Sequence, residues 1–190
     1  MSTFGEMTRA AIAQLLQTRR TIHEFKPGLP PREVVVNAID AARWAPNHRV
    51  TEPWHFYLLG RETANAIADY NAQMIAASGD HGGAEKKRQR WRAMPGWLVL
   101  TCAVSDDPVR SREDYAACCC AAQNMMLYLW SVGVGAKWNT GRISRDPRLY
   151  ELIGADPARE SVVGIYWYGY PAEIPNQRRR PVDSILCEMP

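Results

Sequence analysis

The stretch YAACCCAAQNMMLYLWSVGV, residues 115–134, decides the fold, because it predicts the one long apolar helix of the chain. The helix should end at the glycines Gly133 and Gly135. Its apolar run approaches the length of a membrane span, yet Gln123 and Asn124 lie inside it, and an isolated lipid-facing helix tolerates such side chains poorly. The sequence therefore predicts a helix that is buried by protein.

Short strands and amphipathic helices are predicted on both sides of this helix. Strands are expected at 56–59, 97–104 and 162–168, a polar loop or short strand at 137–141, and helices at 7–16, 31–45, 62–77 and 149–153. The basic residues 84–92 show little apolar periodicity and predict an exposed helix or a mobile flap. About four strands among five or six helices indicate a three-layer α+β fold.

The composition is that of an ordinary globular protein. The chain has 190 residues, 46% of them hydrophobic and 23% charged, which predicts one domain over residues 1–190. A net charge of +3 with scattered basic residues predicts no nucleic-acid partner. The five cysteines are expected to be reduced core residues, with a dimer interface as the alternative for the run 118–120. No signal peptide is recognisable, so we expect a cytoplasmic protein without a membrane segment.

Several common catalytic signatures are absent from the sequence. No glycine-rich loop has the spacing that cradles phosphates, and no metal site is expected, because the four histidines lack ligand spacing and neighbouring cysteine pairs. The cysteine run 118–120 lies inside a predicted helix, where thiols are normally inert. What remains is a set of groups suited to an anionic, flat ligand with polar edges: Arg19, Arg20, Thr21, His23, Asn47, His48, Trp138, Asn139, Thr140 and Arg179.

Some of these groups also have simpler interpretations. Arg19 and Arg20 could cap the carbonyl groups at a helix end, and His48 could be an ordinary surface residue. Trp138 could be core packing, and Arg179 could belong to a solvated tail.

Five motifs, in this order, resemble the nitroreductase family of flavin enzymes. They are the paired arginines and hydroxyl residue within TRRTIHEF at 18–25, the loop APNHRVTEPWHF at 45–56, the helix 122–135 with its Gln-Asn pair and Gly-x-Gly end, the segment 152–171 that ends in Gly-Tyr-Pro, and the basic tail Arg-Arg-Pro at 179–181. Each motif is weak alone, but the ordered set is fairly specific and spans nearly the whole chain. The match is best to the short, single-domain members, which carry a histidine after the Ala-Pro-polar triplet.

The resemblance implies a three-layer α-β-α fold with a central, mostly antiparallel sheet and a long buried central helix. It also implies a homodimer with FMN at the subunit interface and a C-terminal segment that reaches over the partner. The implied cofactor residues are as follows: Arg19, Arg20 and Thr21 for the phosphate and ribityl chain, Arg179 for the phosphate, Asn47 and His48 for the cofactor edge from the partner subunit, and Trp138, Asn139, Thr140 and Gly141 for the flavin ring near N5.

Two residues depart from the family pattern. His23 stands where members usually carry lysine or arginine near the flavin N1 and O2, and a histidine provides positive charge only when protonated. Glu52 stands where many members carry glutamine, and an ionised carboxylate accepts hydrogen bonds but donates none. We expect Glu52 to face solvent or a basic partner.

The implied activity is that of an FMN-dependent oxidoreductase. NADH or NADPH would reduce the flavin, and an electron-poor small molecule such as a nitroaromatic or quinone would then be reduced at the same face, in a ping-pong sequence. No side-chain acid or base is assigned. The alternatives are a specialised flavin enzyme of the same fold, such as a dehalogenase, a flavin-destroying enzyme or a dehydrogenase, a flavin-binding protein with little turnover, and, more remotely, a nucleic-acid-binding module.

Overall fold

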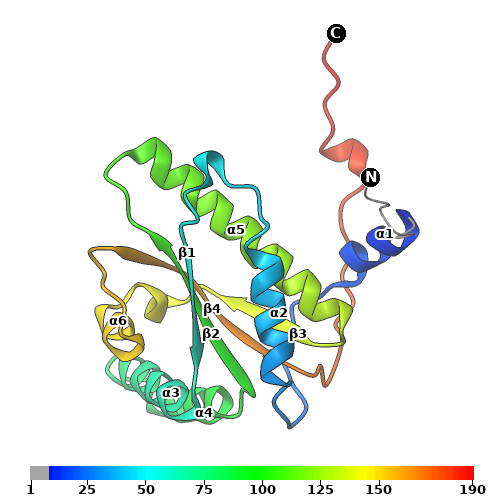
Figure 1. The fold of residues 1–190 in the computed structure, drawn as a ribbon. Helices are drawn as coiled ribbons and strands as arrows, with labels where there is room; N and C mark the ends of the chain where they lie inside the picture. The colour runs from blue at the N-terminus through cyan, green and yellow to red at the C-terminus, as the bar shows by residue number, and fades with distance from the viewer. Residues whose placement is uncertain (1–8) are drawn as a thin grey trace.

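A central antiparallel sheet organises the computed structural model, which describes residues 9–190 (Figure 1). The strands are β1 (Trp54–Leu59), β2 (Gly96–Ala103), β3 (Gly135–Asn139) and β4 (Glu160–Gly169). Their order across the sheet is β1-β2-β4-β3, and every pair is antiparallel. Strands β1 and β3 are therefore the two edges.

Helices cover both faces of this sheet (Figure 1). They are α1 (Arg9–Thr18), α2 (Arg32–Ala42), α3 (Arg61–Ala76), α4 (His81–Arg92), α5 (Pro108–Ser131) and α6 (Pro147–Ile153). Three short 3-10 turns, η1 (His48–Val50), η2 (Arg142–Arg145) and η3 (Val182–Ser184), lie between or after them.

Strand β2 shows why two layers of helices form. Its side chains alternate between the faces: Leu98 and Leu100 pack with α2 and α5, whereas Trp97 and Val99 pack with α3, α4 and α6. Because the strand is buried at every position except its last, and Thr101 is its one polar side chain, both faces must be covered. The predicted three-layer α+β fold is confirmed.

The second face has an aromatic centre. Trp91, Trp97 and Trp167 meet edge to face, with ring centroids 5.0 to 5.7 Å apart. This is a favourable arrangement for aromatic quadrupoles and adds to the stabilisation from burial. It fixes α4, which carries Trp91, against the sheet.

The long helix is confirmed as a buried element, but it begins earlier than predicted. Helix α5 starts at Pro108, because Asp107 accepts hydrogen bonds from the backbone of Val109 at 2.9 Å and Arg110 at 3.4 Å, which is an N-cap. The first two turns of α5 are polar, so the apolar pattern of the sequence did not show where the helix begins. None of the helices within residues 9–190 combines the length and hydropathy that crossing a membrane requires.

Other boundaries differ by small amounts. Strand β1 begins at Trp54 rather than residue 56. The basic segment predicted as an exposed helix or a flap is the regular helix α4. The Asp80 carboxylate caps this helix by accepting a hydrogen bond from Gly83 N at 2.8 Å. The predicted start of the first helix, at residues 7 and 8, lies outside the described residues, and α1 extends to Thr18.

The prediction of a core position was wrong for Cys187, and the dimer-interface alternative for the run 118–120 stays a prediction. Cys102 and Cys118 are buried, whereas Cys120 and Cys187 are exposed, and all five are free thiols. Consecutive residues on a helix point about 100° apart, so a run of three cannot share one buried face.

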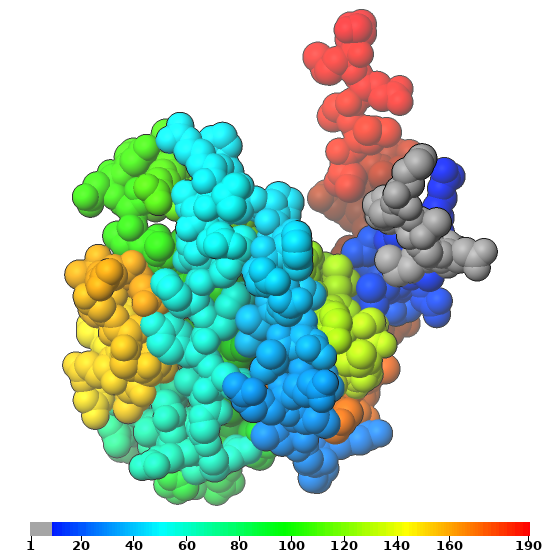
Figure 2. Space-filling model, viewed as in Figure 1, coloured from blue at the N-terminus to red at the C-terminus, as the bar shows by residue number. Residues whose placement is uncertain are grey.

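Helix α1 and the tail after Pro171 stand away from the body (Figures 1 and 2). No residue of α1 is buried, and its apolar Ile12 and Leu16 are exposed, as are Ile185 and Leu186 of the tail. The rest of the described chain does not cover these apolar side chains.

Gly164 on β4 tests the packing beside β3. A Cβ there would overlap the Trp138 indole, which donates a hydrogen bond to the Val163 carbonyl at 3.1 Å. We expect Gly164→Ala to lower the free energy of unfolding by about 1–3 kcal/mol in urea titrations. The control is Gly82→Ala in α4, where a Cβ meets nothing within 4 Å and should raise stability by about 0.4–1 kcal/mol. Equal stability of the two variants would contradict this packing.

Candidate functional site

The segment after α1 lies along the outer edge of β3. Thr21 forms an isolated parallel bridge with Ala136, and the Ile22 amide donates to the Ala136 carbonyl at 3.1 Å. Ile22 is fully buried, and Gly135 is required beside it because a Cβ there would overlap the Ile22 side chain. Thr140 comes four residues after Ala136, just past the end of β3, which places it about 13 Å further along the strand direction.

Three guanidinium groups gather at the start of this edge. They line a pocket of about 440 Å³ together with neighbouring residues, the full set being Leu16, Gln17, Arg19, Arg20, Gln177 and Arg179. Burial lowers the pKa of Arg19, and the charges of Arg20 and Arg179 lower it further. Within residues 9–190 none of the three forms an ion pair. The pocket therefore concentrates positive charge that an anion would neutralise.

Arg20 also has the helix-capping role that was the simpler interpretation. Its Nη1 donates to the Gln17 carbonyl at 2.5 Å and to the Arg19 carbonyl at 2.9 Å. The guanidinium keeps further N–H donors beyond these two bonds. Capping and anion binding are therefore compatible.

The other end of the β3 edge carries an unpaired donor. Asn139 Nδ2 is buried, and in the part of the chain that the structure describes it has no hydrogen-bond partner. Unpaired buried amides are rare and call for a ligand or an ordered water. The neighbouring Thr140 and Gly141 are exposed. This end of the edge is therefore suited to receive a polar ligand.

Trp138 is half-buried and belongs to the core, as its simpler interpretation held. Its ring lies 5.4 Å from that of Tyr166, and its indole N–H is bonded to the Val163 carbonyl. A contact from this residue to a ligand at the edge would therefore come from its backbone.

A cluster of basic side chains, which sequence reasoning missed, surrounds His23. Arg90 Nη2 donates to the His23 carbonyl at 3.4 Å, and Arg90 also lines a pocket of about 350 Å³ with His23. Lys137 lies with its Nζ 5.2 Å from the Trp167 ring centroid. Burial lowers the pKa of Lys137, and the charges of Arg90 and Lys87 lower it further. The pKa of His23 is lowered by burial and by Lys137 and Arg90, so His23 is neutral at pH 7.

The basic helix α4 has two kinds of cation. Arg88 is paired with Glu85 at 2.8 Å and Arg92 with Asp69 at 2.5 Å. Lys87 and Arg90, three residues apart on another side of the helix, have no ion-pair partner among residues 9–190. The i, i+3 spacing of Lys87 and Arg90 could have distinguished them from the paired cations in the sequence, but every charged residue in the run 86–92 is basic.

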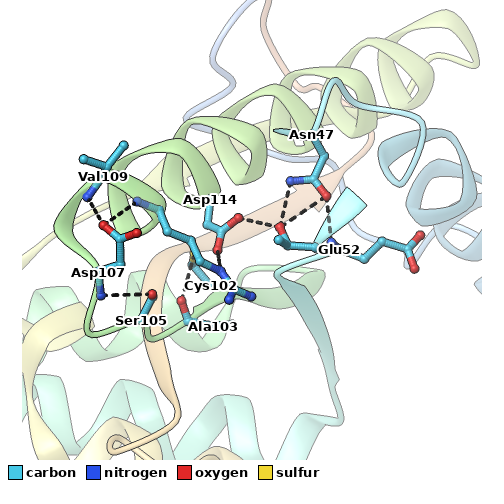
Figure 3. A network of polar contacts seen from close by, with 10 residues as sticks. Asn47, Glu52, Cys102, Ala103, Ser105, Asp107, Val109 and Asp114 are labelled. Atoms are coloured by element: carbon cyan, nitrogen blue, oxygen red, sulfur yellow. Dashed lines mark hydrogen bonds and ion pairs between the residues drawn. The ribbon is translucent and has the colours of Figure 1, made fainter. Parts of the chain in front are cut away.

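The loop at residues 47–52 is strained and internally bonded (Figure 3). Arg49, Val50 and Glu52 all have positive φ, at 60°, 49° and 46°, which costs of the order of 1–3 kcal/mol for each such residue. The side chains of His48 and Glu52 are exposed, and Glu52 bonds through its backbone amide, which donates to Asn47 Oδ1 at 2.7 Å. The expected solvent exposure of Glu52 is seen in the isolated chain.

The structure separates this loop from the arginine end of the β3 edge. Helix α5 holds both: Asp114 near its start accepts from Thr51 Oγ1 at 2.5 Å, and Trp130 near its end donates to Thr18 Oγ1 at 3.0 Å. Sixteen residues of helix between these anchors span about 24 Å. The chain thus brings together the predicted residues at 19–23, 139–141 and 179 along one edge, and places Asn47 and His48 at the far end of α5.

Known proteins are similar to this chain in both sequence and fold. The family model described as the nitroreductase family matches residues 16–170. The Bacillus subtilis protein named "Putative NAD(P)H nitroreductase YfhC" is 30% identical over 187 residues, covering 95% of each chain. A nitroreductase-like family protein from Bacillus cereus has a TM-score of 0.84 at 25% identity, covering 100% of this chain and 98% of that one.

A further solved structure supports the fold. It comes from Desulfovibrio desulfuricans, is described as a nitroreductase in complex with FMN, and has a TM-score of 0.77 at 22% identity over 96% of this chain and 99% of that one. With the family model matching most of the chain and the α-β-α fold shared along its whole length, this protein belongs to the nitroreductase family.

Proposed function

We propose that this protein is an FMN-dependent NAD(P)H oxidoreductase that acts as a homodimer. The observation that carries the proposal is the β3 edge: three guanidinium groups without an ion-pair partner in residues 9–190 lie at one end, and a buried amide without a hydrogen-bond partner in that range lies at the other. A flavin mononucleotide has matching chemistry, a phosphate at one end and a ring with hydrogen-bond acceptors at the other. The names of the relatives and the FMN-bound neighbour support the same cofactor.

At the phosphate end, Arg19 and Arg179 would form charge-assisted hydrogen bonds, with Arg20 adding the donors that capping leaves free. Thr21 is exposed beside them and has a hydroxyl suited to the ribityl chain. The pKa of Arg19 is lowered first by burial and then by the charges of Arg20 and Arg179, and a bound phosphate would offset both effects.

At the ring end, Asn139 Nδ2 and the backbone of Thr140 and Gly141 would lie near N5. We assign the positive charge near N1 and O2 to Lys137 and Arg90, because the lowered pKa of His23 leaves it neutral at pH 7. These residues take over the role that lysine or arginine has in the family at the position of His23. A cation at this place stabilises the negative charge of the reduced ring.

The homodimer follows from the separation of the candidate residues. Asn47 and His48 lie at the opposite end of α5 from Thr18, which precedes the arginine pocket, and we place them at the edge of the partner's flavin. The exposed apolar residues of α1 and of the tail supply surface for such an association. Each dimer would then hold two sites, each built from both chains.

When bound, FMN supplies hydride acceptance and donation at N5. The protein orients it, supplies charge at its pyrimidine edge and leaves one face for small molecules. NADH or NADPH would deliver the hydride, and an electron-poor acceptor such as a nitroaromatic or quinone would take the electrons at the same face after the nicotinamide leaves. No side chain is assigned as an obligatory acid or base. The single domain over residues 1–190 and a cytoplasmic location remain part of the proposal.

The proposal predicts a yellow protein that NADH or NADPH bleaches and a quinone or nitroaromatic restores, followed by absorbance spectroscopy. The same preparation should sediment as a dimer of the 21.4 kDa chain. A colourless protein that takes up no FMN would overturn the cofactor assignment. A yellow protein that neither nicotinamide bleaches would favour a specialised flavin enzyme or a flavin carrier.

Arg19 tests the phosphate site. We expect Arg19→Ala to weaken FMN binding by about 1–3 kcal/mol, the scale of a hydrogen bond to a charged group, in a fluorescence-quenching titration of the apoprotein. The control is Arg148→Ala, which removes an arginine paired with Glu151 on the surface of α6 and should leave affinity unchanged. Equal affinity of both variants would count against the assigned phosphate pocket.

Lys137 and His23 test the source of charge at the ring. At pH 7.5 we expect Lys137→Met to lower the two-electron midpoint potential of bound FMN by about 30 mV, which corresponds to roughly 1.4 kcal/mol. His23→Gln should change it little, because a lowered pKa means that His23 gains charge only at acidic pH. The difference between His23→Gln and wild type should therefore emerge as pH falls below about 6.5. Lys86→Met on exposed α4 is the control, and a larger effect of His23→Gln at pH 7.5 would reverse the assignment.

A further inference from the structure

Among the described residues, Asp114 in α5 is the one buried charged side chain, and the proposed chemistry does not use it. Asp114 is 2% exposed. One oxygen accepts from Thr51 Oγ1 at 2.5 Å, and the other from Arg110 Nε at 3.4 Å. A buried carboxylate is costly unless its hydrogen bonds are made, so the bond to Thr51 connects the loop firmly to α5.

The hydrogen bonds continue from Thr51 into the loop (Figure 3). Asn47 Nδ2 donates to Thr51 Oγ1 at 2.9 Å, and Asn47 Oδ1 accepts from the Glu52 amide at 2.7 Å. The Thr51 hydroxyl has one proton, and the carboxylate at 2.5 Å is its stronger acceptor. The chain of hydrogen bonds therefore runs from Asn47 through Thr51 to Asp114. It connects the first residue of the loop, Asn47, to Thr51 near its end, and connects Thr51 to α5.

The loop would not keep this shape by itself. Three of its non-glycine residues have positive φ, and one of them is the β-branched Val50, for which the left-handed region is a clear outlier. Such strain persists where surrounding interactions determine the conformation. The bonds to Asn47 and Asp114 are the interactions that do so here.

The strained loop presents its side chains outward. His48 and Arg49 are exposed, and Val50 is 78% exposed. None of the three side chains stabilises its own chain by burial. Burial of these side chains therefore does not offset the strain of the left-handed turn, and the side chains are available for contact with another molecule.

We propose that Asp114 is a positioning residue for the flavin site of the partner subunit. Through Thr51 and Asn47 it holds the loop of residues 47–52 in the strained shape that presents His48 to that site. The inference rests on the proposed function, since it takes the loop to border the partner's flavin. It adds that the geometry of this border is set from inside the central helix, by a carboxylate that touches neither cofactor nor substrate.

The matched pair Thr51→Val and Thr51→Ser tests this role. Valine keeps the shape of threonine and removes the donor to Asp114, whereas serine keeps the donor. In the apoprotein, we expect hydrogen exchange of the peptide covering residues 47–56 to be about 10-fold faster in Thr51→Val and close to wild type in Thr51→Ser, the scale of losing one charge-assisted bond. Peptides from β2 and β4 should exchange as in the wild type.

In the FMN-loaded protein, Thr51→Val should weaken FMN binding by about 5-fold to 10-fold, with rescue in Thr51→Ser. The amide oxygen of Asp114→Asn can still accept from Thr51, so this variant should show a smaller increase in loop exchange and a smaller loss of FMN affinity. It replaces Thr51→Val in both measurements if Thr51→Val does not fold. Glu113→Gln is the control, because it neutralises an exposed carboxylate next to Asp114 on α5 and should leave both loop exchange and FMN affinity unchanged.

Unchanged loop exchange in Thr51→Val would overturn the inference. Faster exchange with unchanged FMN affinity would also overturn it, because the bonds would then shape the loop without serving the site. A wild-type protein that binds no FMN would overturn the positioning role together with the proposed function, and the wild-type titration identifies that case.

Discussion

The burial of α5 against the sheet is the constraint on which the rest of the structure depends. This helix packs on one face with α2, and its ends hold the two halves of the candidate site. Its start anchors the strained loop through Asp114, and its end anchors the start of the basic segment through Trp130. Because the helix is rigid, it keeps these two anchors about 24 Å apart along its axis.

The candidate site is also defined by charges that remain unpaired. Most cations on a protein surface find carboxylates or solvent, as Arg88 and Arg92 do with Glu85 and Asp69. Arg19 and Lys137 instead have lowered pKa values, because burial and neighbouring cations disfavour their charged forms. Two such clusters along one strand edge indicate a ligand with negative charge at two places, as a phosphate and a reduced flavin ring provide.

Much of the fold could be predicted because it depends on local patterns. The apolar run at 115–134, the apolar strands and the glycine stops indicate which segments become helices and strands, and the three layers follow from their number. The start of α5 was missed because its first two turns are polar and its cap, Asp107, is a single side-chain interaction. The core prediction failed for Cys187, which lies exposed in the tail, because residue type alone does not decide burial.

The sequence by itself determined the family, the order of the elements and the candidate residues at 19–23, 47–48, 138–141 and 179, since these depend on residue types at fixed spacings. Only the tertiary structure decided which of them meet. It joined Arg90 of α4 and Lys137 of β3 to His23, and it separated Asn47 and His48 from the rest. The physical reason is that electrostatic and hydrogen-bond interactions act over a few ångströms between residues distant in sequence, and no local pattern encodes their proximity.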